Sequence, residues 1–237
     1  MRKKAEKKDI IVEIFNTCKE RDNFVFDNSL VKEVMGRTKS QTNPYDMTKV
    51  DDSNKLPEKL ISEDYCVIHL GGGKHQFFKG IEKVFHKFES IEESEKIEWP
   101  YRPSILNDFS VSESSVLSLC FNQRIIHDFL YLDIVANPKI YNSERKRGIS
   151  FEYFIDGVKM QFENLQIEID LTAEYNGYVT VFEGKNTRNE DGWIKDFNVF
   201  QLYNPFRYYY ELKEENKLNI SQITACYKIE EDGRFYS

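Results

Sequence analysis

Apolar side chains recur every three to four residues in several parts of the chain, which is the spacing of one helix face. This pattern predicts helices over residues 8–20, from Asp27 or Asn28 to Met35, from Ser110 to Tyr131, and from about Phe197 to Glu214. Asp27 or Asn28 can cap the second helix, and Gly36 ends it. A short helix opens at Leu56, with Pro57 in its first turn, where a missing N–H costs little.

The remaining apolar runs predict strands and hairpins. They lie at residues 65–70, 76–78, 151–155 and 158–162, on both sides of Asn176-Gly177, and near 220–229. Asp156-Gly157 and Asn176-Gly177 are strong hairpin signals, because both central residues of a type I′ turn need φ > 0. Two segments are predicted as loops: a polar one from Arg37 to Ser53 and a basic one from Ser143 to Gly148.

The order of these elements predicts two domains. Three helices and a hairpin around Gly71–Lys74 are typical of the winged form of the helix-turn-helix, so residues 1–90 are predicted as a small winged-helix-like domain. An acidic run at residues 91–98 is the predicted boundary. From residue 100 to residue 237 the order helix, strands, helix, strand indicates an α/β sandwich around a mixed sheet, of the α/β (α+β) class.

Composition narrows the functional classes. The net charge of −7 argues against a broadly basic, histone-like nucleic-acid binder, although it leaves specific DNA binding open. No apolar run approaches the roughly 20 residues that span a bilayer, and the basic start has no apolar signal region. We therefore expect a soluble, cytoplasmic protein without a membrane partner. The four scattered cysteines favour reduced thiols over a zinc site.

The predicted hairpin around Asn176-Gly177 carries the candidate chemistry. If these two residues are the whole loop, Asp170 faces Glu183 and Glu168 faces Lys185, with Cβ atoms about 5 Å apart. Two carboxylates that close repel each other, which is usually tolerated where a cation or a proton lies between them. Asp170, Glu183 and the Gly184 carbonyl would suit Mg²⁺, and Lys185 could stabilise negative charge on a phosphate. The hairpin thus indicates metal-assisted phosphodiester hydrolysis.

A simpler interpretation of the same hairpin stays open at this point. Glu168 and Lys185 could form a cross-strand ion pair on an exposed surface, worth about 0.2–1 kcal/mol. That interpretation leaves Asp170 unexplained, because its position opposite Glu183 adds repulsion without compensation. Glu113 ends a Ser110-Val-Ser-Glu113 capping box and is interpreted as a helix cap rather than a catalytic acid.

Several motifs in order resemble one enzyme family. Asp170 followed by Glu183-x-Lys185 on the next strand resembles the motif of the PD-(D/E)xK nuclease superfamily. The segment from Gln201 to Arg207, Gln-Leu-Tyr-Asn-Pro-Phe-Arg, resembles the Q-L-Y-x-P-Y/F-R block of a group of type II restriction endonucleases. Two upstream blocks fit the same group, one over residues 43–57 and one at Ser112-Glu-Ser.

The resemblance implies a restriction-endonuclease-like fold, a mixed sheet flanked by helices, and a Mg²⁺-dependent, site-specific DNA endonuclease. Asp170 and Glu183 would be metal ligands and Lys185 the catalytic lysine. Glu168 would be an auxiliary group, for a second metal or for orienting Lys185. Gln201 would hydrogen-bond a catalytic group or a DNA phosphate, although an exposed helical glutamine is an equal alternative.

The expected partner is double-stranded DNA. Candidate phosphate and base contacts are Arg37, Lys39, Gln41, Asn43 and Lys49 in the polar loop, Lys74 in the predicted wing, and Arg207. A solvated loop without a partner is the alternative for the first five. Palindromic sites favour a homodimer. Alternatives are a DNA repair or junction nuclease on the same core, and a non-catalytic winged-helix regulator, which would not need Asp170 opposite Glu183-x-Lys185.

Overall fold

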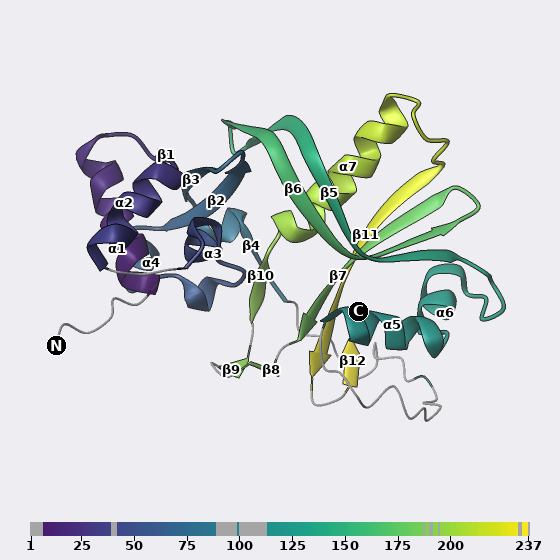
Figure 1. Cartoon of the computed structure of the whole chain (residues 1–237). Coiled ribbons are helices and arrows are strands. Elements are labelled where there is room, and N and C mark those ends of the chain that lie inside the picture. Colours follow the sequence, from purple (N-terminus) through teal and green to yellow (C-terminus); the bar gives the residue numbers. More distant parts are fainter. Residues whose placement is uncertain are drawn as a thin grey trace. The chain divides into compact units, whose positions relative to one another are not determined.

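The structure, a computed structural model, describes residues 7–38, 42–88, 99, 113–186, 188–189, 192–193, 195–231 and 234–236 (Figure 1). The chain forms two compact units. Unit 1 comprises residues 1–87, 147–166 and 195–199, and unit 2 comprises residues 88–146, 167–194 and 200–237. Unit 1 therefore takes two segments from the region predicted as the second domain, whereas the sequence suggested one continuous stretch over residues 1–90.

Unit 1 joins short helices to small antiparallel sheets. Its elements are α1 (Lys7–Glu20), β1 (Val25–Asp27), α2 (Asn28–Thr38), α3 (Pro44–Thr48), η1 (Ser53–Lys55), α4 (Glu58–Ser62), β2 (Tyr65–Gly71), β3 (Lys74–Lys79), η2 (Ile81–Lys83), β4 (Phe85–Lys87) and β10 (Asp196–Asn198). The strands form a sheet of order β1-β3-β2 and a separate β4–β10 pair. The predicted first helix and the hairpin around Gly71–Lys74 are confirmed.

The polar segment between α2 and β2 is more helical than its composition suggested. The prediction that α2 ends at Gly36 is wrong, because the helix continues to Thr38 and Arg37 forms ion pairs with Glu13 (2.8 Å) and Glu33 (2.5 Å). The predicted loop from Arg37 to Ser53 contains α3. The Asn43 side chain caps this helix by accepting the N–H of Tyr45 at 2.9 Å.

Later segments complete the core of unit 1. The long strands β5 (Lys139–Ile155) and β6 (Val158–Tyr175) form a hairpin whose tip, with Asp156 at φ 48° and Gly157 at φ 77°, belongs to this unit. Met160, Phe162 and Phe197 are almost completely buried. The turn of the predicted wing packs on this hairpin, since a Cβ at Gly71 would lie 2.3 Å from the Glu163 carbonyl oxygen.

Two histidines lie side by side inside unit 1. His69 and His75 are paired across β2 and β3, with ring centroids 4.7 Å apart. Nε2 of His69 lies 3.3 Å from the Thr48 hydroxyl, and Nε2 of His75 lies 2.9 Å from Oδ1 of Asn28. Each Nδ1 is buried and has no hydrogen-bond partner within the described residues. Burial lowers the pKa of His69 to about 3 and the pKa of His75 to about 4.

We expect this histidine pair to make unit 1 sensitive to acid. In the unfolded chain each histidine takes up a proton near its ordinary pKa of about 6.5. The contribution of the neutral, buried pair to the free energy of unfolding is therefore fully present above that pH. It is lost as the pH falls toward the folded-state values near 3 and 4, by up to about 1.4 kcal/mol per pH unit for each histidine. Urea unfolding across this range would measure the slope. His69→Gln should flatten it, and an unchanged slope in that variant would contradict the role of the pair.

Unit 2 is built on a mixed sheet of order β12-β11-β7-β6-β5. Its further elements are α5 (Glu113–Asn122), α6 (Ile125–Tyr131), β7 (Tyr178–Asn186), β8 (Arg188–Asn189), β9 (Gly192–Trp193), α7 (Phe200–Glu214), β11 (Gln222–Glu231) and β12 (Arg234–Tyr236). β6 and β7 are antiparallel, and β11 returns parallel to β7. The mixed sheet and the α+β class are therefore confirmed.

Helices pack on both faces of this sheet. Leu117 and Cys120 of α5 form an apolar cluster with Leu171 and Ala173 of β6 and Phe182 of β7. These strand residues share one face. Tyr209 of α7 reaches the other face through the Glu144 and Thr172 network described below.

Two predictions about unit 2 were wrong, and a third is confirmed with a later start. The helix predicted up to Tyr131 is interrupted, because Arg124 adopts a left-handed conformation (φ 66°) between α5 and α6. Of its predicted capping box, Ser110-Val-Ser-Glu113, the first three residues lie outside the described residues, as does the acidic run at residues 91–98, and α5 begins at Glu113. The predicted basic loop from Ser143 to Gly148 lies inside β5. The last helix is confirmed through Glu214, and it begins at Phe200 because Phe197 belongs to β10, which pairs with β4.

Candidate functional site

The turn at Asn176-Gly177 sets the register of the candidate site. Both residues have positive φ, 51° and 81°, and Tyr175 pairs with Tyr178 on either side of them. The register continues unchanged to Leu171 opposite Phe182. The prediction that these two residues form the whole loop is confirmed. The Gly177 carbonyl accepts the Ser221 N–H at 2.8 Å, which ties the turn to the segment before β11.

Asp170 is the next residue of β6 beyond the last pair. Its Oδ2 accepts the backbone N–H of Gly184 at 2.8 Å. A side-chain carboxylate thus binds a peptide group of β7 next to Glu183. The sequence predicted this proximity, and the structure adds that Asp170 is anchored through Gly184.

Glu183 and Lys185 form a buried ion pair. Nζ of Lys185 donates to Oε1 of Glu183 at 2.5 Å, and both residues are buried. Residues i and i+2 share a face of a strand, which allows this contact. Burying two charges costs several kcal/mol each unless they are paired and hydrogen-bonded. Apolar residues at positions 183 and 185 would typically give equal or greater stability than this buried ion pair.

The exposed ion pair of the simpler interpretation is absent from this part of the described structure. Glu168, predicted to face Lys185, forms an ion pair with Arg145 at 3.1 Å, and both side chains are more than half exposed. Lys185 is buried with Glu183 instead. The predicted ion pair between Glu168 and Lys185 is therefore wrong, because Glu168 pairs with Arg145 of β5 and Lys185 pairs with Glu183.

The donor set at this position consists of oxygen atoms. Asp170, Glu183 and the Gly184 carbonyl fit the preference of Mg²⁺ for hard oxygen ligands. No group of three or more His, Cys, Asp or Glu side chains with metal-binding geometry occurs among the residues that the structure describes. The predicted set contains only two carboxylates, so metal binding there stays a prediction.

Helix α7 carries two further predicted residues. Oε1 of Gln201 is buried and has no hydrogen-bond partner in the described structure. Nη2 of Arg207 forms an ion pair with Glu211 at 2.5 Å, and its guanidinium lies 5.0 Å from the ring centroid of Tyr210. Pro205 lies inside this one continuous helix. Within the described structure, the Oε1 atom of Gln201 is thus a buried acceptor without a donor. The Arg207 side chain is instead bound by Glu211 and Tyr210 of the same helix.

The predicted DNA contacts of unit 1 are engaged within the protein where the structure describes them. Lys39 and Gln41 lie outside the described residues. Arg37 pairs with Glu13 and Glu33, and Asn43 caps α3. Nζ of Lys74 lies 3.0 Å from Glu163, so the predicted wing is anchored at this lysine. DNA binding by these residues stays a prediction.

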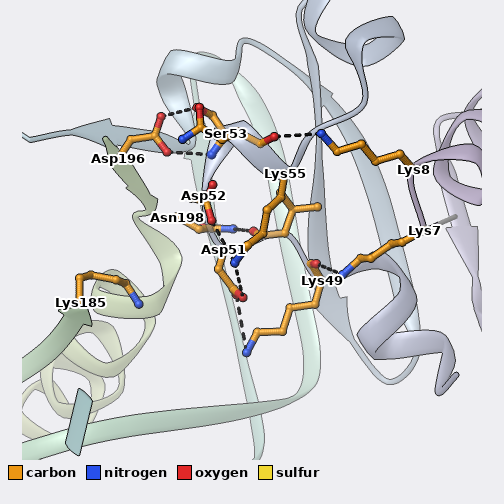
Figure 2. A network of polar contacts seen from close by, with 12 residues as sticks. Lys7, Lys8, Lys49, Asp51, Asp52, Ser53, Lys55, Lys185, Asp196 and Asn198 are labelled. Atoms are coloured by element: carbon orange, nitrogen blue, oxygen red, sulfur yellow. Dashed lines mark hydrogen bonds and ion pairs between the residues drawn. The ribbon is translucent and has the colours of Figure 1, made fainter. Parts of the chain in front are cut away.

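Lys49 belongs to a network of lysines and aspartates in unit 1. Figure 2 shows Lys49 and Lys55 pointing toward Asp51, at N–O distances of 3.6 and 4.0 Å. Lys7 donates to the Lys49 carbonyl at 2.6 Å, and burial lowers the pKa of Lys7. These contacts tie the start of α1 to the segment that follows α3.

A second polar network, on β5, was not predicted. Oε2 of Glu144 accepts the Thr172 hydroxyl at 3.4 Å and the Tyr209 hydroxyl at 3.2 Å, and Oε1 accepts Lys146 at 2.6 Å. Burial raises the pKa of Tyr209. The sequence carried a signal for this network, because Glu144-x-Lys146 repeats the spacing of Glu183-x-Lys185.

Comparison with protein families adds an assignment. The model for a domain of unknown function, DUF6997, matches residues 80–236, which is more than half of the chain. The chain belongs to the DUF6997 family. A second model, for the domain of unknown function DUF6996, matches residues 8–77. In this DUF6997 member every predicted catalytic residue lies inside the first match. Searches of curated proteins and of solved structures gave no match.

Two further findings concern the helices and the cysteines. Among the described helices, none combines the length and apolar character needed to cross a membrane. Cys18, Cys66, Cys120 and Cys226 are all free, and burial raises the pKa of Cys18 and Cys226 to about 11.

Proposed function

We propose that this protein is a Mg²⁺-dependent, site-specific double-stranded DNA endonuclease of the PD-(D/E)xK superfamily, acting in a restriction system. The observation that carries the proposal is the contact of the Asp170 carboxylate with the N–H of Gly184, between Glu183 and Lys185. The contact supports the proposal because it joins Asp170 on β6 to the backbone between Glu183 and Lys185 on the neighbouring strand β7.

The fold around the site supports the proposal. Helices precede and follow a three-stranded antiparallel meander, and β11 adds a parallel strand. Helices pack on both faces of this sheet, in accord with the mixed, helix-flanked sheet implied by the resemblance to restriction endonucleases. In unit 1, the order of helices and the β1-β3-β2 sheet support a winged-helix-like DNA-recognition domain.

Each site residue has a role in the proposed reaction. Asp170, Glu183 and the Gly184 carbonyl would hold Mg²⁺, which supplies charge neutralisation at the phosphate and an activated water when bound. Lys185 would hold its ammonium group against the developing negative charge, and Glu183 fixes that group by the 2.5 Å contact. Gln201 would use its unpartnered Oε1 to orient a donor such as a water. Glu168 would remain auxiliary.

Substrate contacts belong to the same proposal. Arg37, Asn43, Lys49, Lys74 and Arg207 would have to exchange their internal partners for DNA phosphates or bases. Cleavage of both strands of a palindromic site would use a homodimer, whose symmetry mirrors the site.

The test is digestion of DNA by the purified chain. Unmethylated plasmid and phage DNA are incubated with Mg²⁺ or with a chelator, and the ends of the products are mapped. Discrete fragments that require Mg²⁺ are expected. Cutting confined to branched or damaged DNA would favour the repair or junction nuclease. Binding without any cutting would favour the winged-helix regulator.

A further inference from the structure

The sheet of unit 2 carries two Glu-x-Lys triplets with the same internal contact. On β7, Nζ of Lys185 lies 2.5 Å from Oε1 of Glu183, and on β5, Nζ of Lys146 lies 2.6 Å from Oε1 of Glu144. Both lysines therefore bond the glutamate two residues earlier in the same strand. The proposed function uses the first pair and leaves the second without a role.

The two pairs lie on the same face of the sheet, with β6 between them. Glu144 accepts the hydroxyl of Thr172, which is two residues from Asp170 on β6 and so shares its face. Thr172 pairs with Val181, which is two residues from Glu183 on β7. Asp170 is thus flanked by Glu183–Lys185 on one neighbouring strand and by Glu144–Lys146 on the other.

The second pair is fixed but accessible. The side chains of Lys146 and Glu144 are 25% and 21% exposed, against 5% and 6% for Lys185 and Glu183. Tyr209 holds Glu144 through its hydroxyl, and Nζ of Lys146 lies 5.7 Å from the ring centroid of Tyr208. Lys146 therefore presents an ammonium group at a defined position that solvent and ligands can reach.

The positive charges of Lys146 and Lys185 also offset a repulsion between this face of the sheet and the phosphates of the proposed substrate. Glu144, Asp170 and Glu183 place three carboxylates on the face that the proposed substrate must approach, and each repels a phosphate. β5 and β7 are two strand spacings apart, roughly 10 Å. Backbone phosphates of one DNA strand recur about every 3.4 Å along the helix axis. The phosphates of one DNA strand are therefore spaced closely enough to match the separation of the two strands that carry Lys146 and Lys185.

We propose that Lys146 binds a backbone phosphate of the nucleic acid near the phosphate held at Lys185, and that Glu144 pairs with its ammonium group in the free protein and competes with the phosphate for it. The inference rests on the proposed function and adds a second phosphate site to it. Phosphate displaces the Glu144 contact as DNA binds, while Tyr209 and Thr172 keep Glu144 in place.

The experiment measures duplex binding by the full chain in chelator, where Mg²⁺-dependent cleavage is silent. The logarithm of the binding constant is followed against the logarithm of the salt concentration. Lys146→Ala is expected to weaken binding and to reduce the slope by about 0.9, the value for one lost phosphate contact. Glu144→Gln keeps an acceptor for Tyr209 and Thr172 but removes the competing charge, so it should tighten binding.

Lys159→Ala is the matched control. Lys159 forms a 2.8 Å ion pair with Glu152 at the other end of the same hairpin. Lys159→Ala changes the net charge by the same amount as Lys146→Ala. It should leave the salt dependence of DNA binding unchanged. The melting temperature of each variant separates a folding defect from a binding defect.

The outcomes distinguish this inference from the proposed function. If the wild-type chain cuts DNA while Lys146→Ala and Glu144→Gln bind as it does, the second phosphate site is wrong and the nuclease proposal stands. Equal slope changes in Lys146→Ala and Lys159→Ala, or a lower melting temperature without a slope change, would also overturn the site. A wild-type chain that neither binds nor cuts DNA would overturn both.

Discussion

Replacing Lys185 with methionine is expected to reduce Mg²⁺-dependent DNA cleavage by at least about a hundredfold. Loss of one preorganised group that stabilises transition-state charge typically costs about 100–1,000-fold in rate. Methionine keeps an unbranched, apolar stem in the buried position but lacks the ammonium group that Glu183 holds at 2.5 Å. Initial rates of plasmid nicking and linearisation would measure the effect.

The control for this substitution must separate chemistry from folding. Removing Lys185 leaves the Glu183 carboxylate buried without its amine, which typically costs about 3–5 kcal/mol of unfolding free energy. The double variant Glu183→Gln with Lys185→Met removes both charges and should recover much of that stability without recovering cleavage. Lys139→Ala, an exposed lysine of β5, should retain activity. Cleavage by Lys185→Met at the wild-type rate would exclude Lys185 as the catalytic lysine.

A fragment of residues 1–87 is expected not to fold on its own. These residues form the first segment of unit 1, but Met160, Phe162 and Phe197 from later segments are among its buried side chains. β4 also loses its partner β10, and Ser53 loses the Asp196 carboxylate that accepts its backbone N–H at 2.7 Å. Amide dispersion in a proton–nitrogen NMR spectrum and a cooperative urea transition would test this, and both should be absent.

The intact chain offers a matched pair of substitutions for the same point. Phe162→Ala should lower the free energy of unfolding by about 3–5 kcal/mol, because its ring is almost completely buried. Phe154, on the same hairpin, is 67% exposed, and Phe154→Ala should change that free energy by less than about 0.5 kcal/mol. A fragment 1–87 that folds cooperatively, or equal effects of the two substitutions, would show that the hairpin tip is dispensable.

The sequence predicted the parts of this fold that depend on neighbouring residues. Asn176-Gly177 fixed a two-residue turn by its own backbone preferences, and every pair out to Leu171 and Phe182 followed from it. Asp27 likewise capped α2, with its Oδ1 accepting the N–H of Ser29 at 2.9 Å. Such signals are local, so no tertiary contact was needed to interpret them.

Other features depended on contacts between distant segments. The basic segment from Ser143 to Gly148 resembled a loop, but the structure places it in β5. There Glu144 contacts Thr172 and Arg145 contacts Glu168, both on the neighbouring strand β6. β10 is a strand only because β4 pairs with it. In the site, the sequence placed Asp170 near Glu183, but the partner of Lys185 depended on burial, which spacing does not reveal.

The hydrogen bond from Gly184 to Asp170 provides a built-in spectroscopic probe. Its amide proton points at one carboxylate oxygen at 2.8 Å, so its NMR chemical shift will respond to whatever that carboxylate binds. Glycine amides resonate in a sparsely populated region, and only 11 glycines occur in the chain. A metal titration followed at this single resonance would report on the centre of the site without substrate, turnover or any substitution.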